Sequence, residues 1–165
     1  MRRNHRSMPG DDTPSNPTGI KLPPPVLFLA SILLGLSIQR LAPLGLIGGG
    51  LGGTLGLLLV VAGLSLVVLA ARELFKARTT VRPDRGATAL ITNGPFRISR
   101  NPIYLGFALL QVGIALCSNN LWILLLLGIN VVLLNRLVIA REERYLETAF
   151  GKVYRDYSSC VRRWI

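Results

Sequence analysis

Long apolar runs separated by short polar breaks dominate the chain from residue 26 onward. The first run covers residues 26–41, and a stretch containing glycine and proline, residues 43–53, turns the chain into a second run at residues 54–71. Runs of this composition suit the hydrocarbon core of a bilayer, so we predict two membrane-spanning helices here. The glycines at 45–56 follow no strand, so we interpret them as turn and helix-packing residues and not as a phosphate-binding loop.

A third apolar region, residues 103–135, contains no charged residue. As one helix it would be about 50 Å long, which exceeds a hydrocarbon thickness of roughly 30 Å. The region must therefore fold back, and its polar break is "CSNN" at residues 117–120. We predict a helical hairpin there, which gives four spans in total. Both legs are somewhat short for a full crossing, so re-entrant legs are the alternative arrangement.

Apolar residues continue at three- and four-residue spacing after Arg136, which predicts an amphipathic helix that lies against the bundle or the lipid headgroups. Gly151 interrupts this pattern and is expected to end its first segment. Residues 1–24 are polar and rich in proline, a composition typical of a mobile tail. We therefore assign residues 25–165 to a single membrane domain.

Composition supports the membrane assignment, because 50% of the 165 residues are hydrophobic, 16% are charged and the mean hydropathy is +0.47. A net charge of +11 could indicate a nucleic-acid partner, but 18 of the 19 Lys and Arg residues fall in three blocks separated by even numbers of predicted spans. The positive-inside rule places these blocks, both termini and the amphipathic helix on the cytoplasmic side. We therefore expect an all-α integral membrane protein, with about four transmembrane helices and a C-terminal amphipathic cytoplasmic helix, and no nucleic-acid partner.

Several other chemistries are not expected. Cys117 and Cys160 would lie on opposite sides of the membrane, so no disulfide joins them. His5, the sole histidine, lies in the N-terminal tail, which leaves no histidine-based triad and no metal site. Glu73 and Asp84 are interpreted as ion-pair partners of neighbouring arginines.

The sequence "GPFRISRNPIYLG", residues 94–106, brings polar groups to the point where the third span begins. Gly94 and Pro95 are typical of a turn, and Arg100 and Asn101 offer hydrogen-bond donors. Pro102 suits the start of a helix, and Tyr104 adds an aromatic hydroxyl on the first turn. Polar groups beside lipid are costly unless they face one another or a ligand. The donors are therefore candidates for binding an acidic or amide-bearing ligand.

The last span carries polar residues to the same predicted membrane edge. Asn135 and Glu142 are seven residues apart and would share a helix face, as would Arg136 and Glu143. Together with residues 94–106 they predict one ligand site, in which a carboxylate could hold a cation or a ribose. The alternative interpretation is that the arginines are interface anchors and the aromatic residues belong to a membrane-interface belt.

Two stretches together resemble the isoprenylcysteine carboxyl methyltransferase and phospholipid methyltransferase superfamily, in particular its short bacterial members: "LITNGPFRISRNPIYLG" at residues 90–106 and "REERYLETAFGKVYRDYSSCVRRWI" at residues 141–165. The positions that agree with the family pattern in order and spacing are Gly94, Pro95, Arg100, Pro102, Tyr104, Glu142, Glu143, Leu146, Phe150, Gly151, Tyr154 and Tyr157. The resemblance covers roughly residues 79–165 and is specific because two separated motifs agree.

The resemblance implies an enzyme of the bacterial inner membrane that transfers the methyl group of S-adenosylmethionine to a lipophilic acceptor, such as an isoprenylcysteine-like carboxylate or another small isoprenoid or lipid. It implies that the cofactor is lined by a strand-like segment, by the third-span motif and by a carboxylate after the last span: Thr88, Ala89, Leu90, Ile91, Gly94, Phe96, Asn101, Pro102, Ile103, Tyr104 and Glu142. Arg100, inside the same motif, would orient the site.

The chain departs from the family pattern at two positions. Asn101 stands where better-known members have histidine, and it keeps hydrogen-bonding ability without a titrating charge. Val138 stands where the prenylcysteine enzymes have a substrate-binding arginine, and the nearest basic residue on that helix is Arg136. We take Arg136 as the candidate acceptor anchor and group it with Arg100 and Glu142 as the expected catalytic residues.

Three other functions stay open. A phospholipid N-methyltransferase would produce methylated amine headgroups. A non-catalytic lipid-binding scaffold would keep the pocket without the chemistry. A relative of the membrane sterol reductases would use a nicotinamide cofactor instead. In each case the expected partners are membrane lipids and a lipophilic molecule, and a homodimer would support the short first and third spans.

Overall fold

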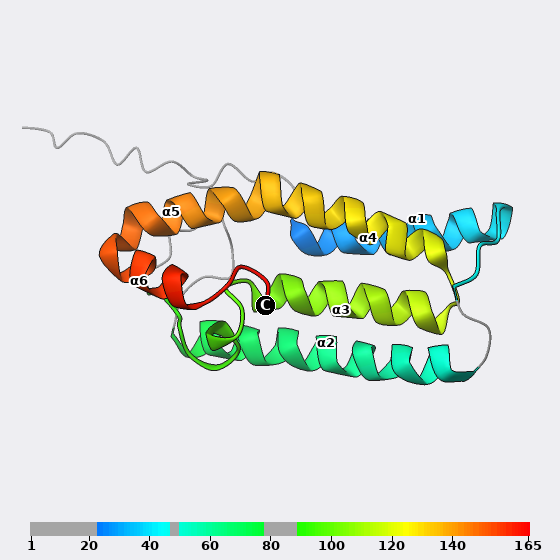
Figure 1. Ribbon diagram of the computed structural model, residues 1–165, viewed down its shortest axis with the longest axis horizontal. Helices are drawn as coiled ribbons and strands as arrows, with labels where there is room; N and C mark the ends of the chain where they lie inside the picture. Colours follow the sequence, from blue (N-terminus) through cyan, green and yellow to red (C-terminus); the bar gives the residue numbers. More distant parts are fainter. Residues whose placement is uncertain (1–22, 47–49, 78–88) are drawn as a thin grey trace, which may run out of the picture.

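The computed structural model describes residues 23–46, 50–77 and 89–165, and every regular element in these ranges is helical. In chain order the elements are α1 (Pro24–Leu41), α2 (Gly50–Lys76), the 3₁₀ turn η1 (Gly94–Arg97), α3 (Pro102–Cys117), α4 (Leu121–Leu133), the π-helical turn η2 (Leu134–Ile139), α5 (Ala140–Phe150) and α6 (Lys152–Cys160) (Figure 1). The predicted mobile tail, Asp84 and Thr88 lie outside the described residues, apart from the two prolines that end the tail.

The apolar runs form helices as predicted. Three helices of the described chain are long and apolar enough to cross a membrane: Pro24–Leu41, Leu51–Lys76 and the continuous helix Leu121–Phe150. The fourth apolar helix, α3, has only 16 residues, so the first leg of the hairpin is short as predicted. The prediction that the second leg is also short is wrong, because that helix continues without a break to Phe150. The protein is therefore an all-α integral membrane protein.

Helix α2 is longer than the sequence predicts at both ends. Residues 50–53, expected in a turn, are helical, and the helix continues beyond residue 71 to Lys76. In lipid the helix is favoured despite its glycines, because no water is present to satisfy backbone groups that a turn would leave unpaired. The additional turn at the C-terminal end carries Glu73 to the first turn of η1.

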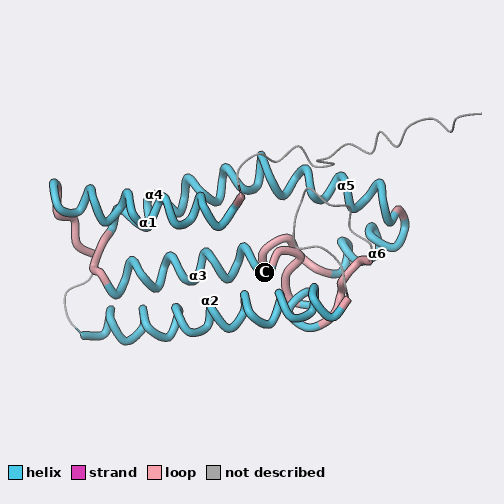
Figure 2. Tube along the Cα trace, turned by 180° about the vertical axis from the view of Figure 1, so that it is seen from behind, coloured by secondary structure: helices cyan, strands magenta, loops and turns pink. Residues whose placement is uncertain are grey.

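The spanning helices are arranged as two pairs, with α2 alongside α3 and α1 alongside α4 in both views (Figures 1 and 2). Residues 118–120 connect α3 to α4, which confirms the hairpin predicted at "CSNN". Asn120 caps α4, since its Oδ1 accepts the backbone N–H of Ile123 at 3.3 Å. Its Nδ2 donates to the carbonyl oxygen of Gly35 on α1 at 3.0 Å, so the connection also anchors the first helix.

Glycines allow α2 and α3 to pack with their backbones in contact. A Cβ atom at Gly56 would lie 2.7 Å from the carbonyl oxygen of Gly113, and one at Gly63 would lie 2.7 Å from the carbonyl oxygen of Gly106. Distances this short leave no space for a side chain. Small residues at such an interface permit the close approach that drives helix association in membranes. The helix-packing role predicted for the glycines at 45–56 is thus confirmed for Gly56.

A buried network of three polar side chains joins α1, α3 and α4. Asn130 donates through Nδ2 to Oγ of Ser31 at 2.8 Å and to Oε1 of Gln111 at 3.1 Å. Gln111 in turn donates through Nε2 to the carbonyl oxygen of Ile123 at 3.0 Å. Because a buried polar group without a partner is costly, this network favours one relative position of the three helices.

Replacing Gly63 with alanine is expected to lower the free energy of unfolding by about 1–3 kcal/mol, because the added methyl group must displace backbone atoms of α3. Gly128→Ala is the matched control, since nothing lies within 4 Å of a Cβ atom at that position. Loss of helical circular dichroism in detergent, followed as denaturant is added, measures both variants. Equal stabilities would contradict the close α2–α3 packing.

Candidate functional site

Polar segments gather at one end of the bundle, which we call the polar end: η1, the N-terminus of α3, α5, α6 and residues 161–165, the C-terminal segment (Figure 1). Gly94 opens η1 with a φ of +58°, a left-handed conformation that favours glycine, and Pro95 follows in the first turn. The predicted turn at these two residues is confirmed. Glu73, whose Cγ would lie 3.1 Å from a Cβ at Gly94, pairs with Lys76 at 2.7 Å, because residues three apart are neighbours on a helix. Among the residues that the structure describes, no arginine pairs with Glu73, whereas Arg78, Arg82 and Arg85 lie outside them.

The C-terminal segment leaves α6 in an extended conformation and is hydrogen-bonded to the motif that begins α3. The backbone N–H of Arg100 donates to the carbonyl oxygen of Arg162 at 3.0 Å. Nδ2 of Asn101 and Oγ of Ser99 both donate to the carbonyl oxygen of Arg163, at 3.1 and 3.2 Å. The amide of Asn101, predicted to contact a cofactor, therefore holds the C-terminal segment in place.

A hydrogen bond joins the two motifs that the sequence analysis singled out. Pro102 begins α3, where its missing N–H costs little, and thereby places Tyr104 on the first turn. The hydroxyl of Tyr104 donates to Oε1 of Glu142 on α5 at 2.8 Å. The ring of Tyr104 packs against a group of buried side chains that we call the apolar cluster: Phe28, Leu134, Val138 and Ile139. The polar contact thus lies directly beside the apolar interior.

Glu143, the next residue on α5, binds two arginines. Its Oε1 lies 3.2 Å from Nη1 of Arg100 and accepts from Nε of Arg163 at 3.0 Å, while its second oxygen pairs with Nη2 of Arg163. Nη1 of Arg100 also lies 3.4 Å from the hydroxyl of Tyr154, to which it donates. The side chains of Arg100 and Glu143 are only 17% and 16% exposed, so water screens this pair much less than a surface ion pair.

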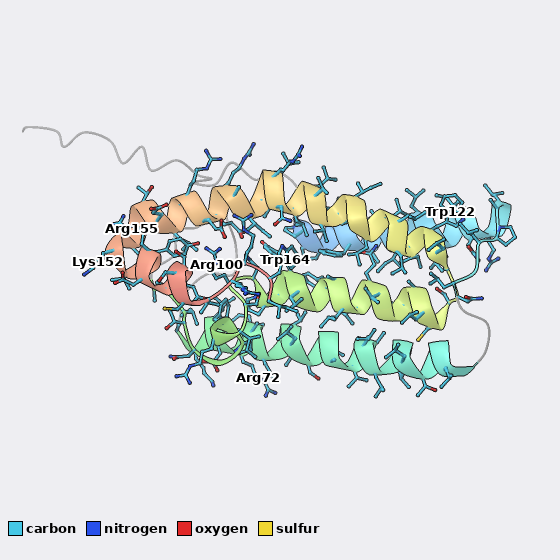
Figure 3. All side chains as sticks on the ribbon, in the orientation of Figure 1. Arg72, Arg100, Trp122, Lys152, Arg155 and Trp164 are labelled. Atoms are coloured by element: carbon cyan, nitrogen blue, oxygen red, sulfur yellow. The ribbon has the colours of Figure 1, made fainter. Side chains whose placement is uncertain are left out.

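Arg100 retains one buried donor without a partner. Its Nε has no hydrogen-bond acceptor among the residues that the structure describes. An unpaired buried donor on a charged group is costly, and such groups are rare in folded proteins unless a ligand or water completes them. Arg100, which Figure 3 shows at the polar end, is therefore the residue of this site most in need of an acceptor.

The tyrosines of α6 act as hydrogen-bonding groups in their neutral form. Burial raises the pKa of Tyr157 to about 12, and its hydroxyl donates to the carbonyl oxygen of Phe96 in η1 at 2.7 Å. Burial, together with the charge of Glu143, also raises the pKa of Tyr154. The hydrogen bond from Arg163 to Glu143 raises the pKa of that guanidinium. At neutral pH both phenols are protonated and the arginine is charged.

The π-helical turn η2 is not predicted by the apolar pattern. A π turn contains more residues than an α turn, so residues seven apart across it no longer share a face. Arg136 is exposed, whereas Glu143 is partly buried against two arginines, and the predicted common face of this pair is therefore wrong. Asn135, also in η2, accepts the indole N–H of Trp164 at 3.1 Å.

The structure places most of the predicted site residues at the polar end: Gly94, Phe96, Arg100, Asn101, Pro102, Ile103, Tyr104 and Glu142. Residues 89–91 also precede η1 but have no regular secondary structure, so the strand-like prediction is wrong for Ala89, Leu90 and Ile91. A strand needs a neighbour to pair its backbone, and the described chain provides none. Thr88, the first residue of that prediction, falls outside the described ranges.

Ser99, Arg163 and Trp164 contribute to the polar end although the sequence analysis gave them no role in the site. Ser99 contacts the backbone of the C-terminal segment, and the contact of Trp164 depends on η2. The side chain of Arg163 reaches Glu143 from the same non-helical segment, so none of these contacts can be derived from spacing along a helix. The sequence feature that could have indicated their role is the ending "RRWI", which combines charge with an aromatic residue directly after the amphipathic helix. Gly151 ends α5 with a φ of +53°, as the interruption of the amphipathic pattern predicted.

These features define a helical integral membrane protein whose polar and charged groups are concentrated in one site at the end of an apolar bundle. The sequence model of the phospholipid methyltransferase family matches residues 51–153, well over half of the chain. The protein belongs to this family, which is part of the isoprenylcysteine and phospholipid methyltransferase superfamily. It is thus a membrane methyltransferase of the phospholipid or isoprenylcysteine type.

A relative from Haemophilus influenzae, itself described only as an uncharacterized protein, is 40% identical over 63 residues. The match covers 38% of this chain and 100% of the relative. No solved structure matches the chain. The family assignment therefore comes from the sequence model, and the arrangement of the site comes from the geometry described above.

Replacing Glu143 with glutamine is expected to lower the free energy of unfolding by about 2–3 kcal/mol, because two partly buried arginines lose their shared carboxylate. Glu147→Gln is the matched control on the same helix. Its pair with Arg155 is 3.8 Å long and both side chains are more than half exposed, so its loss should change stability by less than about 1 kcal/mol. Denaturant unfolding at low and high salt measures the difference, and similar small effects in both variants would show that Glu143 does not hold the polar end together.

Proposed function

We propose that the protein transfers the methyl group of S-adenosylmethionine to a lipophilic acceptor at the polar end. The observation that carries the proposal is the hydrogen bond between Tyr104 and Glu142, because it joins the two family-like motifs beside Arg100. Membership in the phospholipid methyltransferase family supports methyl transfer as the reaction. We further propose that the polar end faces the cytoplasm of a bacterial cell, as the distribution of basic residues suggests.

The residues at the polar end fit the chemical groups of S-adenosylmethionine. The unpaired Nε of Arg100 can donate to the carboxylate of the amino-acid part. The carboxylate of Glu142 can accept from the ammonium group or from ribose hydroxyls, since Tyr104 uses only one position of one oxygen. Asn101 keeps a side-chain oxygen that can accept a further hydrogen bond while its amide nitrogen holds the C-terminal segment. Phe96, Pro102 and Ile103 would supply apolar contact.

When bound, the cofactor would supply a methyl group on a positively charged sulfur, and a nucleophile on the acceptor would take this methyl group by in-line attack with the sulfur as the leaving group. The protein's contribution is alignment and the exclusion of water. Tyr104 is held by Glu142 at the boundary between the polar end and the apolar cluster, so it can fix the position where the two reactants meet. Glu143 and Tyr154 both contact Nη1 of Arg100. These two contacts fix the direction in which its unpaired Nε donates.

The acceptor determines whether a base is needed. A carboxylate is already a nucleophile, whereas a thiol or an amine must lose a proton before or during transfer. We propose a small isoprenoid or lipid acceptor, of which an isoprenylcysteine-like carboxylate is one form. The second candidate is phospholipid N-methylation, which the description of the family favours. A lipid-binding scaffold without activity is the alternative of another class, and loss-of-activity variants distinguish it.

Glu142→Gln is expected to reduce methyl transfer from tritiated S-adenosylmethionine into membrane lipids by roughly 10- to 100-fold, as expected for a lost hydrogen bond to a charged group. Glutamine still accepts from Tyr104, so the fold should be kept. Tyr104→Phe tests the partner side chain, and Glu147→Gln, an exposed carboxylate of the same helix, is the control. Label incorporation that is present in wild type and unchanged in Glu142→Gln and Tyr104→Phe would place the reaction elsewhere.

Arg136→Ala tests the proposed acceptor anchor. Because Arg136 is exposed on η2, its removal should leave the fold intact and raise the KM for an acidic acceptor by about tenfold, as expected when one charge pair in a partly desolvated position is lost. Arg144→Ala, a second exposed arginine one helix further along, is the control. An unchanged KM and kcat in Arg136→Ala would reject the anchor role. Separation of the labelled lipids by headgroup then distinguishes carboxylate methylation from methylated amines.

A further inference from the structure

Trp164 occupies a distinctive place in the C-terminal segment. Its indole packs against the apolar cluster, and its N–H donates to Oδ1 of Asn135 in η2. The residue before it, Arg163, binds Glu143 and so belongs to the polar contacts. Figure 3 shows Trp164 between α3 and the continuous helix formed by α4 and α5. The indole therefore marks the boundary between the polar end and the apolar interior.

The apolar cluster packs α1 against η2 and also contacts side chains of α3. The ring centroids of Phe28 on α1 and Phe107 on α3 lie 5.4 Å apart, and both side chains belong to or contact the cluster. Tyr104 packs against the same cluster while its hydroxyl reaches Glu142. An acceptor whose head reacts beside Tyr104 would thus place its apolar chain along this cluster.

Trp164 differs from the other described side chains at the apolar cluster in the segment that carries it. The residues that form the cluster or pack against it lie on α1, α3, α4 or η2, with Trp164 as the exception. It extends from a short non-helical segment, and its side chain is only partly buried. A side chain fixed by one hydrogen bond and by apolar contact can adjust to a neighbouring chain without moving a spanning helix.

We propose that Trp164 is a specificity-determining residue, whose indole forms one wall of the path taken by the acceptor's apolar chain to the Tyr104–Glu142 contact. The proposal rests on the proposed function and adds the residue that selects the acceptor chain. The hydrogen bond to Asn135 sets the orientation of this wall. Arg163 sets its position along the bundle through Glu143.

The test measures methyl transfer from S-adenosylmethionine to two named acceptors in mixed micelles, N-acetyl-S-farnesylcysteine and dioleoylphosphatidylethanolamine. Trp164→Ala is expected to raise the KM for the acceptor that wild type methylates by about tenfold, because it removes most of an aromatic contact area. The kcat should change less than about threefold, and the affinity for S-adenosylhomocysteine less than about twofold. Trp164→Phe keeps a ring and loses the N–H, so its KM should lie between that of the wild type and that of Trp164→Ala.

Trp122 provides the matched control. It is the other of the two tryptophans in the chain, its N–H donates to the carbonyl oxygen of Ala42 at 2.8 Å, and Figure 3 shows it far from Trp164. Trp122→Phe should leave both constants unchanged. In that variant Trp164 is the sole tryptophan, and its fluorescence should shift when the acceptor is added but not when S-adenosylhomocysteine is added alone.

The outcomes separate the two proposals. Absence of S-adenosylhomocysteine binding by the wild-type protein would overturn the proposed function itself. Cofactor binding without methylation of either acceptor would overturn the acceptor classes on which the role of Trp164 depends. If Trp164→Ala does not fold, Trp164→Phe and the single-tryptophan fluorescence decide the question. An unchanged KM in a folded variant, or a parallel loss of cofactor affinity, would show that Trp164 is not an acceptor wall.

Discussion

The shared carboxylate of Glu143 is the interaction on which the arrangement of the polar end depends. Arg100 lies two residues before α3, which packs in the α2–α3 pair, whereas Glu143 lies on the continuation of α4, which packs in the α1–α4 pair. Arg163 binds the same carboxylate and so attaches the C-terminal segment to α5. One carboxylate therefore joins both helix pairs and the last residues of the chain, and it does so where limited exposure to water strengthens the attraction.

The rest of the bundle satisfies a different constraint, because lipid drives helices together only weakly. Glycine contacts between α2 and α3 and the network of Ser31, Gln111 and Asn130 supply close packing and hydrogen bonds in place of a hydrophobic effect. These contacts lie within the apolar part of the bundle and leave the polar end free to carry chemistry. The apolar cluster and Trp164 lie between the two regions, where a lipophilic acceptor and a polar cofactor would meet.

Much of this organisation can be predicted from the sequence, for physical reasons that apply to particular residues. The charge-free run of residues 103–135 is too long for one crossing, which requires the hairpin. Tyr104 lies at the start of this run and Glu142 lies after its end, so a hairpin brings both to the same membrane edge. In the structure the two side chains are joined at 2.8 Å. The long α2 was missed because glycine marks turns in water, whereas lipid favours the helix. The contacts of Arg163 and Trp164 were missed because they depend on a π turn and on an extended segment, neither of which has a periodic pattern.

The most direct test of the central claim is calorimetric titration of the purified protein in detergent with S-adenosylmethionine and S-adenosylhomocysteine, with a reduced nicotinamide dinucleotide for comparison. Both adenosyl ligands are expected to bind saturably to the wild-type protein and not to Glu142→Ala, and the nicotinamide is expected not to bind. Absence of binding by the wild-type protein, or equal binding by Glu142→Ala, would contradict a cofactor site at the polar end.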